Sequence, residues 1–298
     1  MSFLWVIFTV VAAAGQTARN AMQRELTQSL GAVGATHVRF LFGFPFALVF
    51  LALVALGTHT ALPATHAAFW LWDMLGALAQ IGGTALMLVV MTERSFVVTA
   101  AYLKTEPLFV AALGLAVLHD PLTPGMVAAM LLAIAGVVLI SLRRGTAVAG
   151  GGWHSAVYGL SAGALFGISA IGYRGAILSL HLPGYVMGAT FTLAVGLVIQ
   201  AALLSAWLAL RDPRVLLAIA RLWRPSLFAG FMGAAASEFW FLAFALASAA
   251  SVRTLGLIDV LFAQIVSHVV FRQKTTAREA AGIALLVAGA VLLVWAHK

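Results

Sequence analysis

Apolar residues run through this chain in long blocks separated by short polar connectors. A transmembrane helix needs about 20 mainly apolar residues to cross the hydrocarbon layer. We therefore expect ten transmembrane helices, and connectors such as 57–66 and 211–225 are too short to hold a soluble domain. The expected helices cover 2–22, 33–57, 67–92, 94–118, 122–142, 153–178, 184–210, 226–247, 249–271 and 277–296.

The composition supports an integral membrane protein. Hydrophobic residues make up 63% of the chain and charged residues only 9%, whereas a soluble domain is about 25% charged. The absence of cysteine excludes disulfides, thiolate metal sites and cysteine nucleophiles. The net charge of +8 does not indicate nucleic-acid binding, because the basic residues lie in the short connectors, where they meet anionic lipid headgroups.

The basic residues are unevenly distributed between the connectors. The connectors at 57–67 and 119–121 have no Lys or Arg, and Arg174 is the only basic residue near the sixth. The positive-inside rule then predicts cytoplasmic odd-numbered connectors and both termini outside the cytoplasm, in a multi-pass protein of the cell (inner) membrane. Lys298 is an exception. The odd-numbered connectors and their flanks carry Arg19, Arg24, Arg39, Arg94, Arg143, Arg144, Arg211, Arg214, Arg221, Arg224, Arg272, Lys274 and Arg278.

The two halves of the chain resemble each other. A shift of 153 residues places SFVVTAAYLKTEPLFVAALG, which begins at Ser95, over SAASVRTLGLIDVLFAQIVS, which begins at Ser248. Glu106 then meets Asp259, so an acidic residue falls inside the fourth expected helix of each half. We expect two five-helix repeats, at 1–145 and 152–298. Five is an odd number, so the repeats must enter the bilayer in opposite orientations, as in many transporters with a site between the halves.

The motifs TEPLFVAALGLAVLHDPLT followed by LLAIAGVVL, with ALASAASVRTLGLIDVLFAQ in the second half, resemble the drug/metabolite transporter superfamily. The chain is most similar to the ten-helix EamA type, over almost its whole length. The resemblance implies export or exchange of small metabolites, amino acids or toxic compounds. The family often has Glu just before the fifth helix of each half, where this chain has Asp120 and Gln273, so no role is assigned to that position.

Several charged residues fall deep inside the expected helices. A charge at the bilayer centre costs about 2.5 to 3.5 kcal/mol on insertion scales, so each is a candidate functional residue. The deep carboxylates are Glu106, Asp259 and Glu238, and Lys104 and Arg253 lie nearby. In one interpretation these residues pair internally and hold helices together. In the other, the carboxylates alternate between a proton and the substrate, and the two cations hold a substrate carboxylate. Lys104 and Glu106 are two residues apart and face different neighbours, so they cannot simply pair with each other.

Other residues are weaker candidates for the same site. Tyr102 offers a hydroxyl one turn from Glu106, and Trp240 is too deep for an interfacial belt, so it either binds a cation or packs. Gln80 lies in a small-residue helix and is a minor candidate for a substrate hydrogen bond. Asp73 is expected at the membrane interface or an entrance. The small-residue helices 122–142 and 277–296 are interpreted as structural, or as the interface of a homodimer.

Two common catalytic motifs are absent from the sequence: there is no HExxH and no nucleotide-binding glycine loop. We therefore expect no enzyme activity, no cofactor and no metal. The sequence favours a secondary transporter of amino acids or cationic or zwitterionic compounds, an exporter or an antiporter with the proton as coupling ion. The alternatives are a transporter of anionic or phosphorylated metabolites that uses Lys104 and Arg253, and a non-transporting protein, either a lipid-modifying enzyme or an assembly scaffold.

Overall fold

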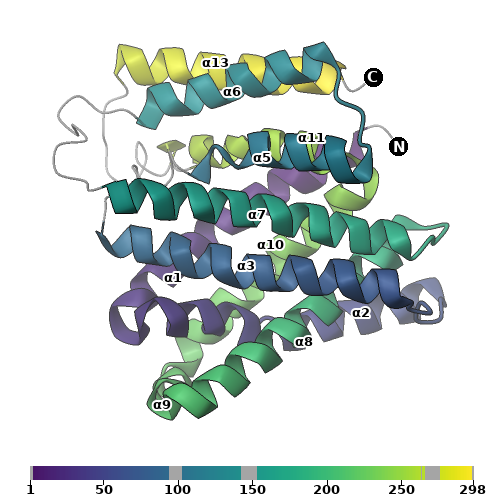
Figure 1. The fold of residues 1–298 in the computed structure, drawn as a ribbon, viewed down its shortest axis with the longest axis vertical. Helices are drawn as coiled ribbons and strands as arrows, with labels where there is room; N and C mark the ends of the chain where they lie inside the picture. The colour runs from purple at the N-terminus through teal and green to yellow at the C-terminus, as the bar shows by residue number, and fades with distance from the viewer. Residues whose placement is uncertain (1–2, 94–102, 142–152, 263, 266–275, 297–298) are drawn as a thin grey trace.

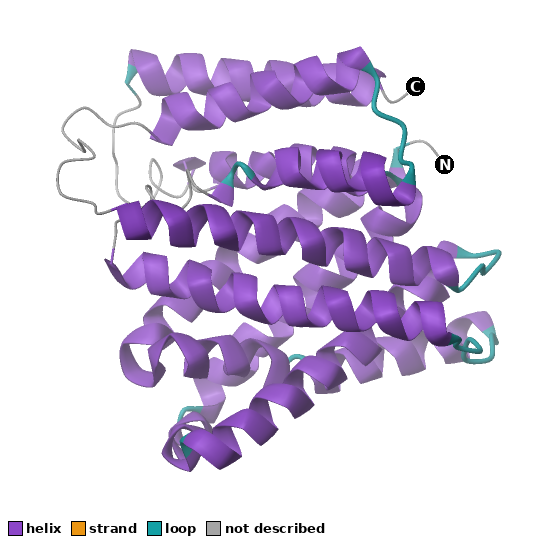
Figure 2. Ribbon diagram, in the orientation of Figure 1, coloured by secondary structure: helices purple, strands orange, loops and turns teal. Residues whose placement is uncertain are grey.

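The computed structural model describes residues 3–93, 103–141, 153–262, 264–265 and 276–296, and every element within these ranges is helical (Figure 2). The helices lie side by side in one bundle, and α1 begins at the same end of the bundle as α13 ends (Figure 1). The elements are α1 (Leu4–Leu41), α2 (Phe44–Thr58), α3 (Ala67–Glu93), α5 (Glu106–Leu113), α6 (Pro124–Ser141), α7 (Trp153–Ser179), α8 (Tyr185–Arg211), α9 (Pro213–Arg221), α10 (Trp223–Leu246), α11 (Ala249–Leu255) and α13 (Ala277–Ala296), with a π-helical turn at Gly114–Leu118 and a 3₁₀ turn at Gly256–Ile258.

Six helical segments in the described ranges are long and apolar enough to cross a membrane. The first of them, Leu4–Thr58, changes direction at Gly31, whose φ of 68° and ψ of 174° are not helical. Glycine reaches a positive φ without the steric cost of a side chain. The Nε2 atom of Gln23 lies 3.2 Å from the carbonyl oxygen of Ala35, whereas twelve residues of straight helix would span about 18 Å. The chain therefore turns back on itself, within the connector expected between 22 and 33.

Three helix pairs form the closest packing in the bundle: α3 with α7, α1 with α10, and α6 with α13. Glycines allow these approaches. A Cβ added at Gly172 would lie 2.7 Å from the backbone nitrogen of Gly76, and one at Gly136 would lie 2.6 Å from that of Leu286. Small residues let helix backbones approach in membranes, where the lipid is as apolar as the side chains. The small-residue segments expected to pack do so here, between α6 and α13.

Both of the charged segments are irregular. α5 begins at Glu106, has Pro107 in its first turn, and is preceded by a turn at Lys104 and Thr105. Proline fits the first turn of a helix because it lacks a backbone donor. In the second half, the 3₁₀ turn at Gly256–Ile258 follows α11, so the matched segment is also broken there.

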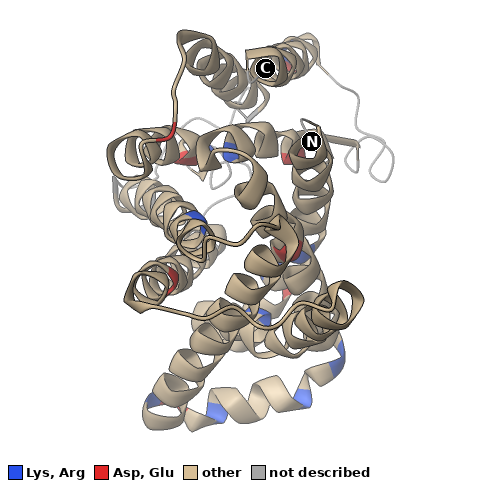
Figure 3. Cartoon of the chain, turned by 90° about the vertical axis from the view of Figure 1, so that its right-hand side faces the viewer, with Lys and Arg blue, Asp and Glu red and all other residues tan. Residues whose placement is uncertain are grey.

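Several expected helices agree closely with the observed ones: 277–296 coincides with α13, and 184–210 differs from α8 by one residue at each end. The first two do not agree, because α1 continues to Leu41 and α2 begins only at Phe44, inside the expected helix 33–57. The connector expected at 211–225 contains the short helix α9. This short helix carries Arg214 and Arg221 with apolar residues on its other face, the pattern of a helix at a membrane surface. Charged residues are sparse elsewhere on the helices (Figure 3).

Candidate functional site

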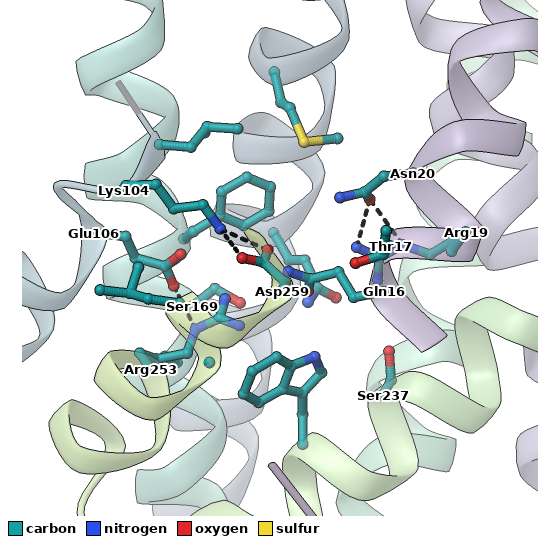
Figure 4. Close-up of a pocket in the computed structure, with 18 of the residues that line it drawn as sticks. Gln16, Thr17, Arg19, Asn20, Lys104, Glu106, Ser169, Ser237, Arg253 and Asp259 are labelled. Atoms are coloured by element: carbon teal, nitrogen blue, oxygen red, sulfur yellow. Dashed lines mark hydrogen bonds and ion pairs between the residues drawn. The ribbon is translucent and has the colours of Figure 1, made fainter. Parts of the chain in front are cut away.

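A cavity of about 110 Å³ lies between α1, α3, α5, α7, α10 and α11 (Figure 4). Both halves of the chain contribute to its lining. Its wall extends along α3 from Gln80 to Met91, toward the C-terminal end of that helix. The lining combines apolar side chains such as Met87 and Phe241 with an unusual number of charged ones. Concave sites with convergent polar groups are where proteins bind small molecules.

Two ion pairs cross this cavity, and each joins the first half of the chain to the second (Figure 4). Lys104 Nζ lies 2.5 Å from Asp259 Oδ1, and Arg253 Nε lies 2.5 Å from Glu106 Oε1. Their side chains are only 12–15% exposed. The internal-pairing interpretation is confirmed for these four residues, and so is the expectation that Lys104 and Glu106 face different partners. Because all four also line the cavity, a role in binding stays a prediction.

The breaks in the two charged segments position these side chains. Lys104 lies in the turn before α5, Glu106 is the first residue of α5, and Asp259 directly follows the 3₁₀ turn. Arg253 lies in the last turn of α11. Discontinuous helices at membrane depth bring backbone ends and side chains to one point, and they are tolerated where they line a polar cavity.

Trp240 contacts this group through its aromatic face. The Cζ atom of Arg253 lies 4.8 Å from the centroid of the Trp240 ring. Gly256 makes room for the indole, because a Cβ there would lie 2.4 Å from Trp240 Cη2. Trp240 is 5% exposed and lines the cavity. The aromatic face of Trp240, which was a candidate site for a cationic substrate, is therefore covered by the guanidinium of Arg253.

Gln80 lies at the cavity wall and belongs to a buried polar cluster. Its Oε1 atom accepts hydrogen bonds from Tyr173 Oη at 3.3 Å and from Gln200 Nε2 at 2.9 Å. Asp73 is 0% exposed, and neither of its carboxyl oxygens has a hydrogen-bond partner among the described residues. α8 packs over Asp73, since a Cβ at Gly196 would lie 3.2 Å from Asp73 Oδ1. The expectation that Asp73 lies at the membrane interface or an entrance stays a prediction.

Two predicted site residues are not placed in the cavity. Glu238 does not line it; its Oε1 accepts a hydrogen bond from Thr190 in α8 at 2.5 Å, and its Oε2 is buried without a partner among the described residues. The helix turns this side chain toward α8, away from Glu106 and Asp259. Tyr102 lies outside the described residues.

Sequence reasoning missed two cavity residues, Arg19 and Arg39. It assigned both to the flanks of the first connector, yet each is only 3% exposed and lines the cavity. A signal was available in the sequence, because Arg19 falls inside the expected helix 2–22 and Arg39 inside 33–57. Arginine within a span usually faces a polar interior or a partner.

A second buried charge cluster lies outside the cavity lining and is centred on Arg174 of α7. Its guanidinium binds Asp120 through both carboxylate oxygens, with Nε at 3.1 Å and Nη2 at 3.0 Å. Its Nη1 donates to the backbone carbonyl oxygens of Phe244 and Ala247. We call Arg174, Asp120 and these two carbonyls the Arg174 cluster. It joins α7, the segment before α6 and the C-terminal end of α10.

The comparisons with known proteins bear on the fold alone. No family model matches the chain, and no curated protein matches it. Among solved structures, 29 chains match. One, described only as "Crystal structure of protein", is 17% identical, covers 97% of both chains and has a TM-score of 0.68. At this identity the similarity establishes a shared fold, an all-helical bundle with several apolar helices long enough to cross a membrane.

Proposed function

We propose that this protein is a secondary transporter of small polar metabolites, with ten transmembrane helices in two inverted five-helix repeats. The observation that carries the proposal is the cavity lined by both halves, with ion pairs that join one half to the other. In transporters of this architecture, rocking of one half against the other opens a central site alternately to each side.

The crossing of α6 and α13 supports the repeat. A Cβ at Gly136 would lie 2.6 Å from the nitrogen of Leu286 and 2.7 Å from the oxygen of Gly282. A Cβ at Gly289 would lie 2.7 Å from the nitrogen of Ala133 and 2.9 Å from the oxygen of Ala129. The shift of 153 residues that aligns the two halves converts the first set of contacts into the second, because it places Gly136 on Gly289 and Ala133 on Leu286. The same shift relates α3 to α10 and α1 to α7, so the pair formed by α3 and α7 corresponds to the pair formed by α10 and α1. Such exchange is what a pseudo-twofold axis between the halves produces.

The cross-half ion pairs suggest how transport and energy could be coupled. If the halves move apart on one side, Lys104 and Arg253 separate from Asp259 and Glu106, and an unpaired charge at this depth is costly. A proton on the carboxylate, or a substrate on the cation, offsets that cost. This gives Glu106 and Asp259 the role of proton acceptors and makes the proton the proposed coupling ion.

Transport in proteoliposomes tests the proposal. Purified protein would be reconstituted with an imposed pH gradient and a mixture of amino acids, organic cations, dicarboxylates and phosphorylated metabolites. We expect saturable, gradient-dependent accumulation of at least one solute, measured by mass spectrometry of the vesicle contents. Empty liposomes are the control. If no solute moves under any gradient, the proposal is wrong and an enzyme or scaffold takes its place.

The orientation is a separate prediction. The charge bias predicts a C-terminus outside the cytoplasm, so a reporter that fluoresces only in the cytoplasm should stay dark when fused after Lys298. The same reporter placed in the odd-numbered connector after Arg211 should fluoresce. The opposite pattern would reverse the topology, with both termini inside.

A further inference from the structure

Among the described residues, the buried arginines Arg19 and Arg39 have only neutral hydrogen-bond partners. Arg19 donates to Asn20 Oδ1 from Nε at 3.2 Å and from Nη2 at 2.9 Å. Arg39 donates to Thr84 Oγ1 at 3.2 Å and to Ser237 Oγ at 3.5 Å, while its Nε is buried with no hydrogen-bond partner in the part of the chain that the structure describes. No described carboxylate forms an ion pair with either. A buried charge normally has a counter-charge, and the described residues supply none to these two arginines.

The two side chains lie next to each other on the surface of α10. A Cβ added at Gly233 would lie 3.4 Å from Arg19 Cδ and 3.4 Å from Arg39 Cγ, so both stems cross this glycine. Arg253 lines the same cavity. The fold therefore gathers like charges that repel one another at the wall of a cavity, where Arg19 and Arg253 are labelled in Figure 4.

The cavity as a whole also carries an excess of positive charge. Four cationic side chains line it, Arg19, Arg39, Lys104 and Arg253, against the two carboxylates of Glu106 and Asp259. Because the carboxylates are occupied by Lys104 and Arg253, an excess of two positive charges remains on the arginine pair. A ligand with two negative charges would balance it. A cationic ligand would add to the repulsion, and the aromatic face of Trp240 is already covered.

We propose that Arg19 and Arg39 form an anion-binding subsite for a small molecule with two negative charges on a phosphate or on two carboxylates. The planar guanidinium presents paired donors that match the oxygens of such groups. Asn20 and Ser237, which already contact the arginines, supply neutral hydrogen-bonding groups beside them. The statement that this anion is the transported substrate rests on the proposed function; the statement that it binds does not.

Binding to the purified protein tests the subsite without transport. The probes are inorganic phosphate and succinate, with sodium chloride at equal ionic strength as the reference, and thermal melting and equilibrium binding in detergent are the measurements. We expect at least one of the two dianions to raise the melting temperature and to bind saturably, and a cation such as tetramethylammonium to have no effect. If neither dianion binds above the chloride reference, the proposal is wrong.

Variants of the two arginines test whether they form the binding site. For the anion that binds, Arg19→Gln and Arg39→Gln should each raise its Kd about tenfold or more, whereas Arg221→Gln in α9, the matched control, should leave it unchanged. If a Gln variant does not fold, Arg19→Lys and Arg39→Lys keep the positive charge but lose the paired donors of the guanidinium. These variants should weaken binding severalfold. Wild-type affinity in all folded variants would overturn the assignment. Anion binding without uptake of any solute would refute the proposed transporter and leave the subsite standing. Uptake of other solutes without anion binding would refute the subsite and leave the transporter standing.

Discussion

The Arg174 cluster and the arginine pair are two buried cationic sites in one helical bundle, and they differ in how completely their donors are used. Arg174 has both oxygens of Asp120 and two backbone carbonyls. Within the described ranges, Arg19 and Arg39 have only neutral side chains as hydrogen-bond partners, and one donor of Arg39 has none. A satisfied buried charge holds structural elements together, whereas an unsatisfied one costs stability. The comparison separates a cluster whose donors are used within the protein from the pair that we propose as an anion-binding subsite.

The largest effect is expected at Arg174. Arg174→Ala removes one partner of a pair whose side chains are 11% and 10% exposed, and it leaves Asp120 uncompensated. Breaking such a pair typically costs about 3 to 5 kcal/mol. We expect a clear fall in stability, measured by thermal melting with detection of the folded fraction by size exclusion. A melting temperature equal to that of the wild type would show that the cluster is not structural.

The next effect concerns transport and the cross-half pairs. Glu106→Gln keeps the shape of the side chain and removes its charge opposite Arg253. If Glu106 exchanges protons, gradient-driven accumulation should fall by about tenfold or more, because the amide of Gln cannot take up and release the coupling proton. The folded fraction should stay above that of Arg174→Ala. Loss of stability with normal transport would make the pair purely structural.

Arg39→Gln sharpens the comparison with Arg174, because both changes remove a buried guanidinium. The amide can still donate to Thr84 or Ser237, and the repulsion from the neighbouring charge of Arg19 disappears. We therefore expect the free energy of unfolding to change by about 1 kcal/mol or less. Thermal melting beside Arg174→Ala is the measurement. A loss as large as that at Arg174 would mean that Arg39 is structural as well.

The smallest effect is expected at Glu238, which faces α8 and not the cavity. Glu238→Gln retains an oxygen that accepts the hydrogen bond from Thr190. Transport should stay within about twofold of the wild type, because the new side chain keeps an acceptor for Thr190 and does not line the cavity. This variant is the matched control for Glu106→Gln. If it abolishes coupling while Glu106→Gln does not, the proton site lies beside α8.

The charged residues show how far sequence reasoning reached. Glu106 and Asp259 were selected because each is an acidic residue at the same place in two similar apolar segments, and both lie in the cavity. Their partners could not be assigned, since Arg253 is 147 positions from Glu106 and Lys104 is 155 from Asp259. Such pairs depend on which helices become neighbours. Glu238 looked equivalent by depth, and only the rotation of α10 separates it from the cavity.

The sequence by itself determined that the chain is a bundle of apolar helices, where most of those helices begin and end, and that charges lie deep within them. These properties follow from local hydrophobicity and helix-breaking residues, which act over about 20 residues. Only the tertiary structure decided which buried charges are paired, that Asp73 is covered by α8, and that Arg19 and Arg39 share the surface at Gly233. The physical reason is that burial and pairing are properties of contacts between distant segments, and a hydrophobic pattern records only that a face is covered.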